Sequence, residues 1–276
     1  MTPRGSDKWP ARAAGSIVCV TRTLHVHRYG PDSPAQVLAV HGLTGHGQRW
    51  QTLATQHLPG VAVAAPDLIG HGRSSWAAPW TIECNVEALV GAIHNPVVVV
   101  GHSFGGALVL ALAAARPDLV SALVLLDPAV GLDGEWMRQI ADDMYASPDY
   151  TDRAEARAEK ANGSWGEVEP AELDRELDEH LIDLPSGRVG WRISIPAMLS
   201  YWSELARPVT LPPEDIPTTL VRATRTRPPY ASDELIATLA QRLGPNLQLL
   251  EWDCDHMVAQ ALPAQTAAVI RGHLGS

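Results

Sequence analysis

The sequence has few cysteines and no long apolar run. Its three cysteines, Cys19, Cys84 and Cys254, are odd in number and far apart, which favours free thiols in a reducing compartment over a disulfide framework. No apolar run reaches about 18 residues, so we expect no membrane-spanning helix. Residues 1–15 carry Arg and Lys without a following apolar stretch, which argues against a secretory signal peptide. Together these absences predict a cytoplasmic protein.

An excess of basic residues is also lacking, because the net charge is −10. Residues 131–206 contain 17 acidic and 7 basic residues, whereas the rest of the chain contains 14 of each. Nucleic acids and anionic membrane surfaces are bound by basic patches, so we expect neither as a partner. An acidic surface gives at most a mild preference for neutral or cationic substrates. No metal-ligand cluster, phosphate loop or nucleotide fingerprint occurs, so we expect no metal and no cofactor.

What the chain does contain is an alternation of short apolar runs and helical patterns. The runs Val37–Val40, Val97–Val100 and Ala122–Leu126 are apolar at every position, as expected for strands buried on both faces of a parallel sheet. Alternating strands and helices imply right-handed crossovers, and 276 residues suffice for one large α/β domain. Further strands are expected at Ser16–Val20, Leu24–Arg28, Val61–Ala65, Thr218–Arg222 and Leu247–Trp252, and helices at Arg49–His57, Ile82–His94, Phe104–Arg116, Ser232–Leu243 and Leu262–His273.

The pattern changes after Asp127. The next 80 residues or so show helical stretches without a convincing strand. An acidic helical insertion with apolar faces is typical of a lid, and its tryptophans could line a pocket or form the lid's own core. The best helices are expected at Thr151–Ala161, Ala171–Asp183 and Trp191–Arg207. We therefore expect residues 1–130 and 207–276 to form the core domain and residues 131–206 to form the lid.

The segment Gly101-His102-Ser103-Phe104-Gly105 joins a buried strand to an apolar helix. A serine hydroxyl is a poor nucleophile, and a sharp strand-to-helix turn holds it exposed beside a base. Such a turn crowds the backbone, so glycines are needed on both sides of the serine. The context predicts Ser103 as a nucleophile, with His102 as a packing residue.

Two amides are expected to stabilise an oxyanion. Acyl transfer needs two donors aimed at the developing charge. The amide of Phe104 gives one donor, because it follows the nucleophile at the start of a helix. The amide of Leu43, in the loop that follows the strand Val37–Val40, gives the other. His41 is expected to brace this loop through hydrogen bonds.

His256 is the candidate general base. It lies in Asp255-His256-Met257, after the strand expected at Leu247–Trp252. A histidine late in the chain can act as the base if its loop reaches the serine turn. The chain has eleven histidines, so His256 stands out by this position.

Taken together, these elements resemble the α/β-hydrolase superfamily, close to its esterase, lipase and haloperoxidase-like branch. The resembling segments run in family order across most of the core: His41-Gly42, residues 66–74, the turn at Ser103, and residues 255–257. The resemblance implies an α/β-hydrolase fold, a mostly parallel twisted sheet with helices on both faces and an inserted helical lid. In this family the stretch around Asp67 and His71 is a structural turn, so neither is expected to do chemistry.

The resemblance also implies an acid between the serine and the histidine. Its commonest place is the loop after the strand Thr218–Arg222, where this chain has Thr226. The nearest carboxylate, Asp233, opens the next helix, where acidic residues usually serve the helix dipole. Some branches, including many haloalkane dehalogenases, place the acid after the preceding strand, where this chain has Asp127. We expect Asp127 to orient the imidazole, with Asp233 as the alternative.

The function so implied is a serine hydrolase, carboxylesterase- or lipase-like, acting on small-molecule, neutral, ester-like substrates through a Ser-His-Asp triad and an acyl-enzyme. Two alternatives stay open: C–C bond or lactone hydrolysis by the same fold, and a ligand-binding protein on a hydrolase scaffold. Epoxide hydrolase and dehalogenase chemistry are disfavoured, since their nucleophile is an aspartate and here the position holds Ser103. The specific substrate, the acyl chain length and the oligomeric state are not fixed by the sequence.

Overall fold

A mostly parallel sheet forms the centre of the computed structural model, which describes residues 22–275. Within this range its seven strands lie in the order β1-β3-β2-β4-β5-β8-β9, and only β1 runs antiparallel to its neighbour. The strand expected at Ser16–Val20 lies outside the described residues. The strands are β1 (Val26–Tyr29), β2 (Val37–Val40), β3 (Val63–Pro66), β4 (Val97–His102), β5 (Val120–Leu126), β8 (Thr218–Ala223) and β9 (Leu247–Trp252).

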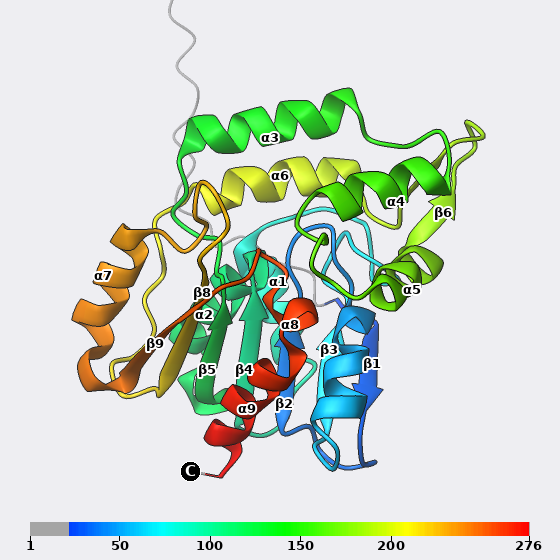
Figure 1. Ribbon diagram of the computed structural model, residues 1–276. Helices are drawn as coiled ribbons and strands as arrows, with labels where there is room; N and C mark the ends of the chain where they lie inside the picture. Colours follow the sequence, from blue (N-terminus) through cyan, green and yellow to red (C-terminus); the bar gives the residue numbers. More distant parts are fainter. Residues whose placement is uncertain (1–21, 276) are drawn as a thin grey trace, which may run out of the picture.

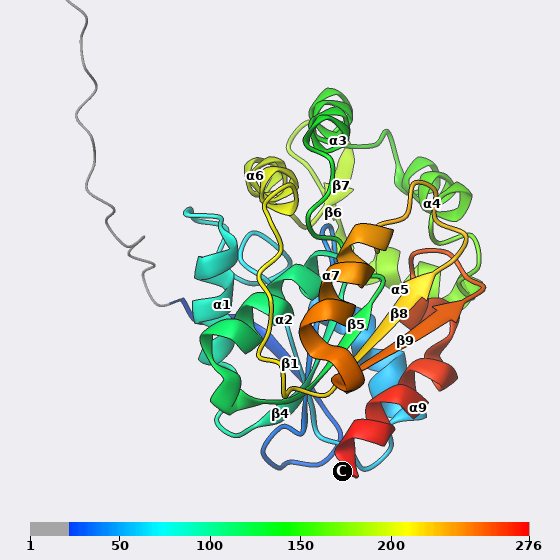
Figure 2. The ribbon, with the colours of Figure 1, turned by 90° about the vertical axis from the view of Figure 1, so that its left-hand side faces the viewer.

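Helices cover both faces of this sheet because its central strands are apolar on both faces (Figure 2). Along β4, Val97 and Val99 pack into one apolar cluster, whereas Val98 and Val100 pack into another on the opposite face. The first cluster is covered by α1 (Ile82–Val90), α2 (Phe104–Ala115) and α7 (Asp233–Leu243). The second is covered by α8 (Val258–Ala261), α9 (Pro263–Leu274) and the short turns η1 (Gly47–Trp50) and η2 (Leu53–His57).

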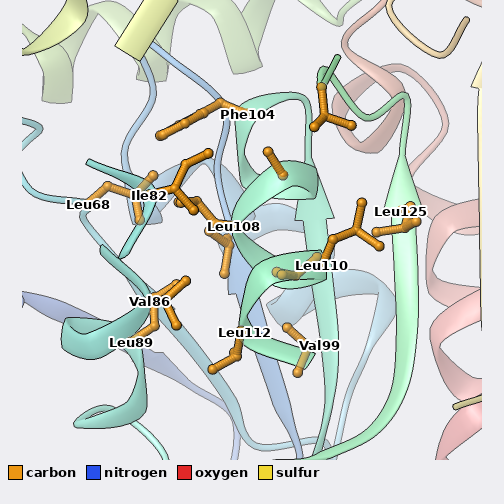
Figure 3. Packing of buried hydrophobic residues seen from close by; sticks show 14 of the residues in the cluster. Leu68, Ile82, Val86, Leu89, Val99, Phe104, Leu108, Leu110, Leu112 and Leu125 are labelled. Carbon is orange, nitrogen blue, oxygen red and sulfur yellow. The ribbon is translucent and has the colours of Figure 1, made fainter. Parts of the chain in front are cut away.

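Helix α2 is the most buried helix of the described chain, as its apolar sequence predicts. Nine of its twelve residues are buried. In Figure 3, Leu108 points toward Ile82 of α1 and Leu110 points toward Leu125 of β5. Complete burial of a leucine contributes roughly 1.5–3 kcal/mol. This packing fixes the start of α2, where Ser103 lies.

The segment between β5 and β8 lies across the carboxyl edge of the sheet, with α3 and α6 uppermost (Figure 1). The expectation of no strand is wrong here, because Leu181–Asp183 (β6) and Val189–Trp191 (β7) form a short antiparallel hairpin. Three-residue strands are too short to show an alternating pattern. The helices are α3 (Gly134–Ala146), which the sequence prediction missed, α4 (Arg153–Asn162), α5 (Pro170–His180) and α6 (Ile195–Leu205).

Two further expectations concern the cysteines, which were expected to be free thiols, and membrane-spanning helices, of which none was expected. Cys254 is a buried free thiol, whereas Cys84 is disulfide-bonded, so the expectation of free thiols is wrong for Cys84. In residues 22–275, no helix has the length and apolarity needed to cross a bilayer.

Candidate active site

Ser103 occupies a strained turn between β4 and α2. Its backbone angles, φ +55° and ψ −122°, lie where non-glycine residues are uncommon. A Cβ on Gly101 would lie 2.5 Å from the carbonyl oxygen of Gly105, and a Cβ on Gly105 would lie 2.3 Å from that of Val40. Only glycine fits at these two positions, which is the crowding that the sequence predicts for a nucleophile turn.

His256 and Asp127 are hydrogen-bonded to each other. The ring Nδ1 of His256 donates to Oδ2 of Asp127 at 2.6 Å. Asp127 is fully buried at the end of β5, and its other oxygen accepts the amide of Ala223 at 3.2 Å. Because Nδ1 carries the proton in this bond, Nε2 of His256 is left with a free lone pair. A neutral imidazole in this tautomer can accept a proton.

Asp233, the alternative acid, lies elsewhere. Its side chain is 89% exposed at the start of α7 and pairs with Arg222 at 2.7 Å. Thr226, at the usual position of the acid, donates to Asp255 at 3.3 Å. Asp255 in turn accepts the main-chain amide of His256 at 2.7 Å, so it holds the backbone of the histidine rather than its ring.

The loop after β2 packs directly against Ser103. A Cβ on Gly42 would lie 2.8 Å from Cβ of Ser103, which is closer than side-chain carbons can approach. Position 42 therefore needs a glycine for the loop to pass this close to the serine. Phe104 is the first residue of α2, and its amide therefore has no acceptor within the helix. The amide of Leu43 makes no hydrogen bond within residues 22–275. Within residues 22–275 the amides predicted as oxyanion donors are therefore not used in hydrogen bonds of the fold.

His41 braces this loop, as expected. Its Nε2 accepts the amide of Leu68 at 3.0 Å, so Nδ1 carries the proton and donates to the carbonyl oxygen of Gly42 at 2.7 Å. Burial, together with the neighbouring His71, holds the pKa of His41 well below its usual value. A permanently neutral imidazole suits this structural role.

The aromatic ring of Tyr230 lies beside His256, and sequence reasoning missed it. The two ring centroids are 4.2 Å apart, and Tyr230 also stacks on Trp136 of α3 at 5.2 Å. No local motif marks this tyrosine. His102 also lies beside His256 and donates from Nε2 to its carbonyl oxygen at 2.8 Å, and burial holds the pKa of His102 well below its usual value. These neighbours limit the movement of the histidine loop.

A cavity of about 500 Å³ lies between Thr44, next to Leu43, and the segment above the sheet. Lys160 lies in its wall, with its ammonium 4.7 Å and 4.3 Å from the ring centroids of Trp165 and Trp191. Burial lowers the pKa of Lys160 to about 8. The apolar part of the lining is formed by Ile140, Met144, Trp165, Trp191, Ile193 and Ile195.

Three possible metal ligands, His25, His27 and Asp67, lie together on the edge of the sheet, with ligand atoms within 4.8 Å of one another. Asp67 already accepts the amides of Gly47 and Arg73 at 2.7 and 2.8 Å. It also accepts His27 Nε2 at 3.2 Å. These bonds account for Asp67 as the structural residue that the sequence predicts.

Comparison with known proteins identifies the family of this chain. The profile of the alpha/beta hydrolase family matches residues 37–269. The lipase LipV of Mycobacterium tuberculosis is 63% identical over 256 residues, which cover 91% of this chain and 98% of that protein. A pimeloyl-[acyl-carrier protein] methyl ester esterase of Neisseria meningitidis is 35% identical over 95 residues, which cover 34% of this chain and 37% of that protein.

Two solved structures superpose over most of the chain. An E-2-(acetamidomethylene)succinate hydrolase gives a TM-score of 0.77 at 20% identity and covers 92% of this chain and 98% of that chain. An esterase from a marine microorganism gives a TM-score of 0.70 at 21% identity, with coverage of 92% and 99%. The chain belongs to the alpha/beta hydrolase family.

Proposed function

We propose that this chain hydrolyses carboxylic esters of small or medium, uncharged acyl groups through a Ser103-His256-Asp127 triad. The broader class, a hydrolase of the carboxylesterase or lipase type, follows from the family and from the 63% identity to lipase LipV. The observation that carries the triad is the 2.6 Å hydrogen bond from His256 to the fully buried Asp127.

In the proposed mechanism Ser103 attacks the ester carbonyl while Nε2 of His256 takes the hydroxyl proton. Asp127 keeps the imidazole in the tautomer that leaves Nε2 free, and it stabilises the imidazolium that forms. The proton then passes to the leaving alcohol and the acyl group stays on Ser103. A water molecule, deprotonated by the same histidine, releases the acid.

The oxyanion of each tetrahedral intermediate is proposed to accept the amides of Leu43 and Phe104. Removing one such donor from an enzyme typically costs about 10²–10³-fold in rate. The strained turn at Ser103, directly before Phe104, and the close approach of Gly42, directly before Leu43, support this assignment.

We further propose that residues 131–206 act as a lid over a core of residues 1–130 and 207–276, and that the acyl group enters the cavity beside Thr44. The apolar residues of that cavity come mainly from the lid, as an acyl site needs. A volume of about 500 Å³ exceeds a short acyl chain, so medium chains should be accepted.

The experiment that tests this function compares wild type with Ser103→Ala on p-nitrophenyl esters of increasing chain length. Loss of the nucleophile should lower kcat/KM by about 10³-fold or more. The melting temperature should stay close to that of wild type. Full turnover by the folded alanine variant would show that Ser103 is not the nucleophile.

A further inference from the structure

We propose that Glu176, on α5 of the lid, and Arg49, on the core, position the Leu43 amide of the oxyanion hole through a relay of hydrogen bonds. This inference rests on the proposed function, because it concerns the amide that would stabilise the oxyanion. It assigns a role in catalysis to a charge cluster that lies outside the triad.

The first step of the relay is the contact of Arg49 with the oxyanion loop. Its Nη2 donates to the carbonyl oxygen of Thr44 at 2.8 Å. The guanidinium also packs closely on the loop, because a Cβ on Gly45 would lie 2.7 Å from its Nη1. Thr44 has a φ of +57°, which a non-glycine residue adopts only when its surroundings hold it there.

The second step follows from the planarity of the peptide bond. The carbonyl of Thr44 and the amide of Gly45 belong to one peptide unit, so Arg49 fixes that amide as well. The Gly45 amide donates to the carbonyl oxygen of Gly42 at 3.1 Å. This carbonyl shares a second planar unit with the amide of Leu43. Together with the bond from Nδ1 of His41 at 2.7 Å, this bond fixes the Gly42 carbonyl and with it the direction in which the Leu43 amide points.

The third step is the anchoring of Arg49 by the lid. Glu176 is buried, with 1% of its side chain exposed, and accepts from Nε and Nη2 of Arg49 at 3.0 and 2.5 Å. It also accepts from His46 at 2.9 Å and from Lys160 at 3.0 Å. Although burial alone would raise the pKa of Glu176, these positive and hydrogen-bonding partners, Arg49 first, hold it well below the usual range. The carboxylate therefore stays ionised and keeps the guanidinium in place.

A chain of hydrogen bonds that begins at a cation also polarises each following amide. Arg49 thus strengthens as well as aims the Leu43 donor. Glu176 belongs to the lid, so the oxyanion hole is complete only while α5 is docked on the core. Glu176 and Arg49 are positioning residues, since neither touches the reacting atoms.

The test uses two variants, Glu176→Gln and Arg49→Lys, and measures kcat, KM and inhibition by an alkyl trifluoromethyl ketone. This ketone forms a tetrahedral oxyanion with the serine, so its inhibition constant reports the oxyanion hole. We expect kcat to fall by about tenfold or more. This loss should be smaller than the loss caused by removing a whole oxyanion donor. The inhibition constant should rise by the same factor while KM changes little.

Glu172→Gln is the matched control. Glu172 lies one turn earlier on α5 and also contacts the core, through Thr52, but it does not touch Arg49. Its loss should leave kcat and the inhibition constant within about twofold of wild type. Arg49→Lys retains the positive charge beside Glu176 but removes the guanidinium group that donates both to Glu176 and to the carbonyl oxygen of Thr44. This variant therefore tests the relay even if Glu176→Gln fails to fold.

Two results would overturn the inference. One is a folded Arg49→Lys or Glu176→Gln enzyme with wild-type kcat and a wild-type inhibition constant. The other is a fall in kcat without any rise in the inhibition constant. Failure of the proposed function is seen separately, because Ser103→Ala would then retain turnover.

Discussion

The sheet core and helices α4 and α5 above it are held in place by different forces. Every residue of β4 and nine of the twelve residues of α2 are buried, and nearly all of them are apolar. Within residues 131–206, α3 and α6 pack into the main apolar cluster through residues such as Met137, Met198 and Tyr201. Helices α4 and α5 instead share a small apolar cluster, and α5 meets the core through charged side chains. Glu176 pairs with Arg49, and Glu179 pairs with Arg73 at 2.6 Å.

This difference implies different responses to mutation, pH and salt. Apolar burial changes little with protonation or ionic strength, whereas ion pairs depend on both. The proposed nucleophile and the proposed acid are placed by the core. The cavity wall and the relay to Leu43 depend on the segment above it. Substitutions of core residues should therefore mainly impair catalysis. Substitutions of charged residues should mainly weaken the docking of α4 and α5 on the core.

The largest effect is expected for the proposed triad acid, Asp127. Asp127→Asn should lower kcat by about 10³–10⁴-fold, because the amide favours the wrong tautomer of His256. Asp233→Asn should leave kcat within about twofold, since Asp233 is exposed and pairs with Arg222. Steady-state ester hydrolysis by both variants measures this. If only the Asp233 variant loses activity, the acid is misassigned.

A pair of leucine deletions compares the stability of the two regions. Leu108→Ala in α2 should lower the free energy of unfolding by about 4 kcal/mol, because Leu108 is fully buried in the main cluster. Leu177→Ala removes a buried leucine from the small cluster, so its effect should be local. Hydrogen exchange is expected to rise throughout the sheet for the first variant and mainly in α4 and α5 for the second. A uniform rise for Leu177→Ala would mean that the two regions unfold as one.

Glu176→Gln should destabilise the chain by about 3 kcal/mol at neutral pH, because it leaves Arg49 and Lys160 without their carboxylate. The pKa of Glu176 lies well below its ordinary value of 4.5 in the folded chain. Its contribution is therefore present above pH 4.5 and is lost as the pH falls through the folded-state value. Denaturant unfolding of both proteins across acid pH should show their difference shrinking below about pH 4.5. A difference that does not depend on pH would contradict an ionised Glu176.

The smallest effect is expected at a partly exposed pair between the two regions. Arg73 is 45% exposed and Glu179 is 19% exposed, so screening by water limits their attraction. Arg73→Gln should change the free energy of unfolding by less than about 1 kcal/mol. The change should vanish in about 1 M salt, where charges are screened within roughly 3 Å. An effect that persists in high salt would point to lost packing instead.

The core was predictable because its signals are local. Four β-branched residues before Gly101 and an apolar helix after Ser103 specify strand, turn and helix within 20 residues or so. Asp127 could be proposed because parallel strands end at the same edge of a sheet. Helix α3 carried a readable signal that was missed, since Asp133 caps it by accepting the amide of Trp136 at 2.8 Å.

Other features have no local signal. Arg49 and Glu176 are 127 residues apart, and nothing near either residue marks them as partners. Tyr230 meets His256 only because β8 and β9 are neighbours in the sheet. The hairpin of β6 and β7 has three residues in each strand and a turn at Gly187, whose φ is +81°. Such contacts depend on how the elements pack, which periodicity does not describe.

Covalent labelling of wild type, Ser103→Ala and Asp127→Asn with a fluorophosphonate, followed by peptide mass spectrometry, tests the proposed triad most directly. We expect one adduct per wild-type chain, located on Ser103. We also expect no adduct on the alanine variant and labelling of the Asp127 variant that is slower by about 10³-fold. An adduct on another residue, or wild-type labelling rates in Asp127→Asn, would contradict the proposed triad.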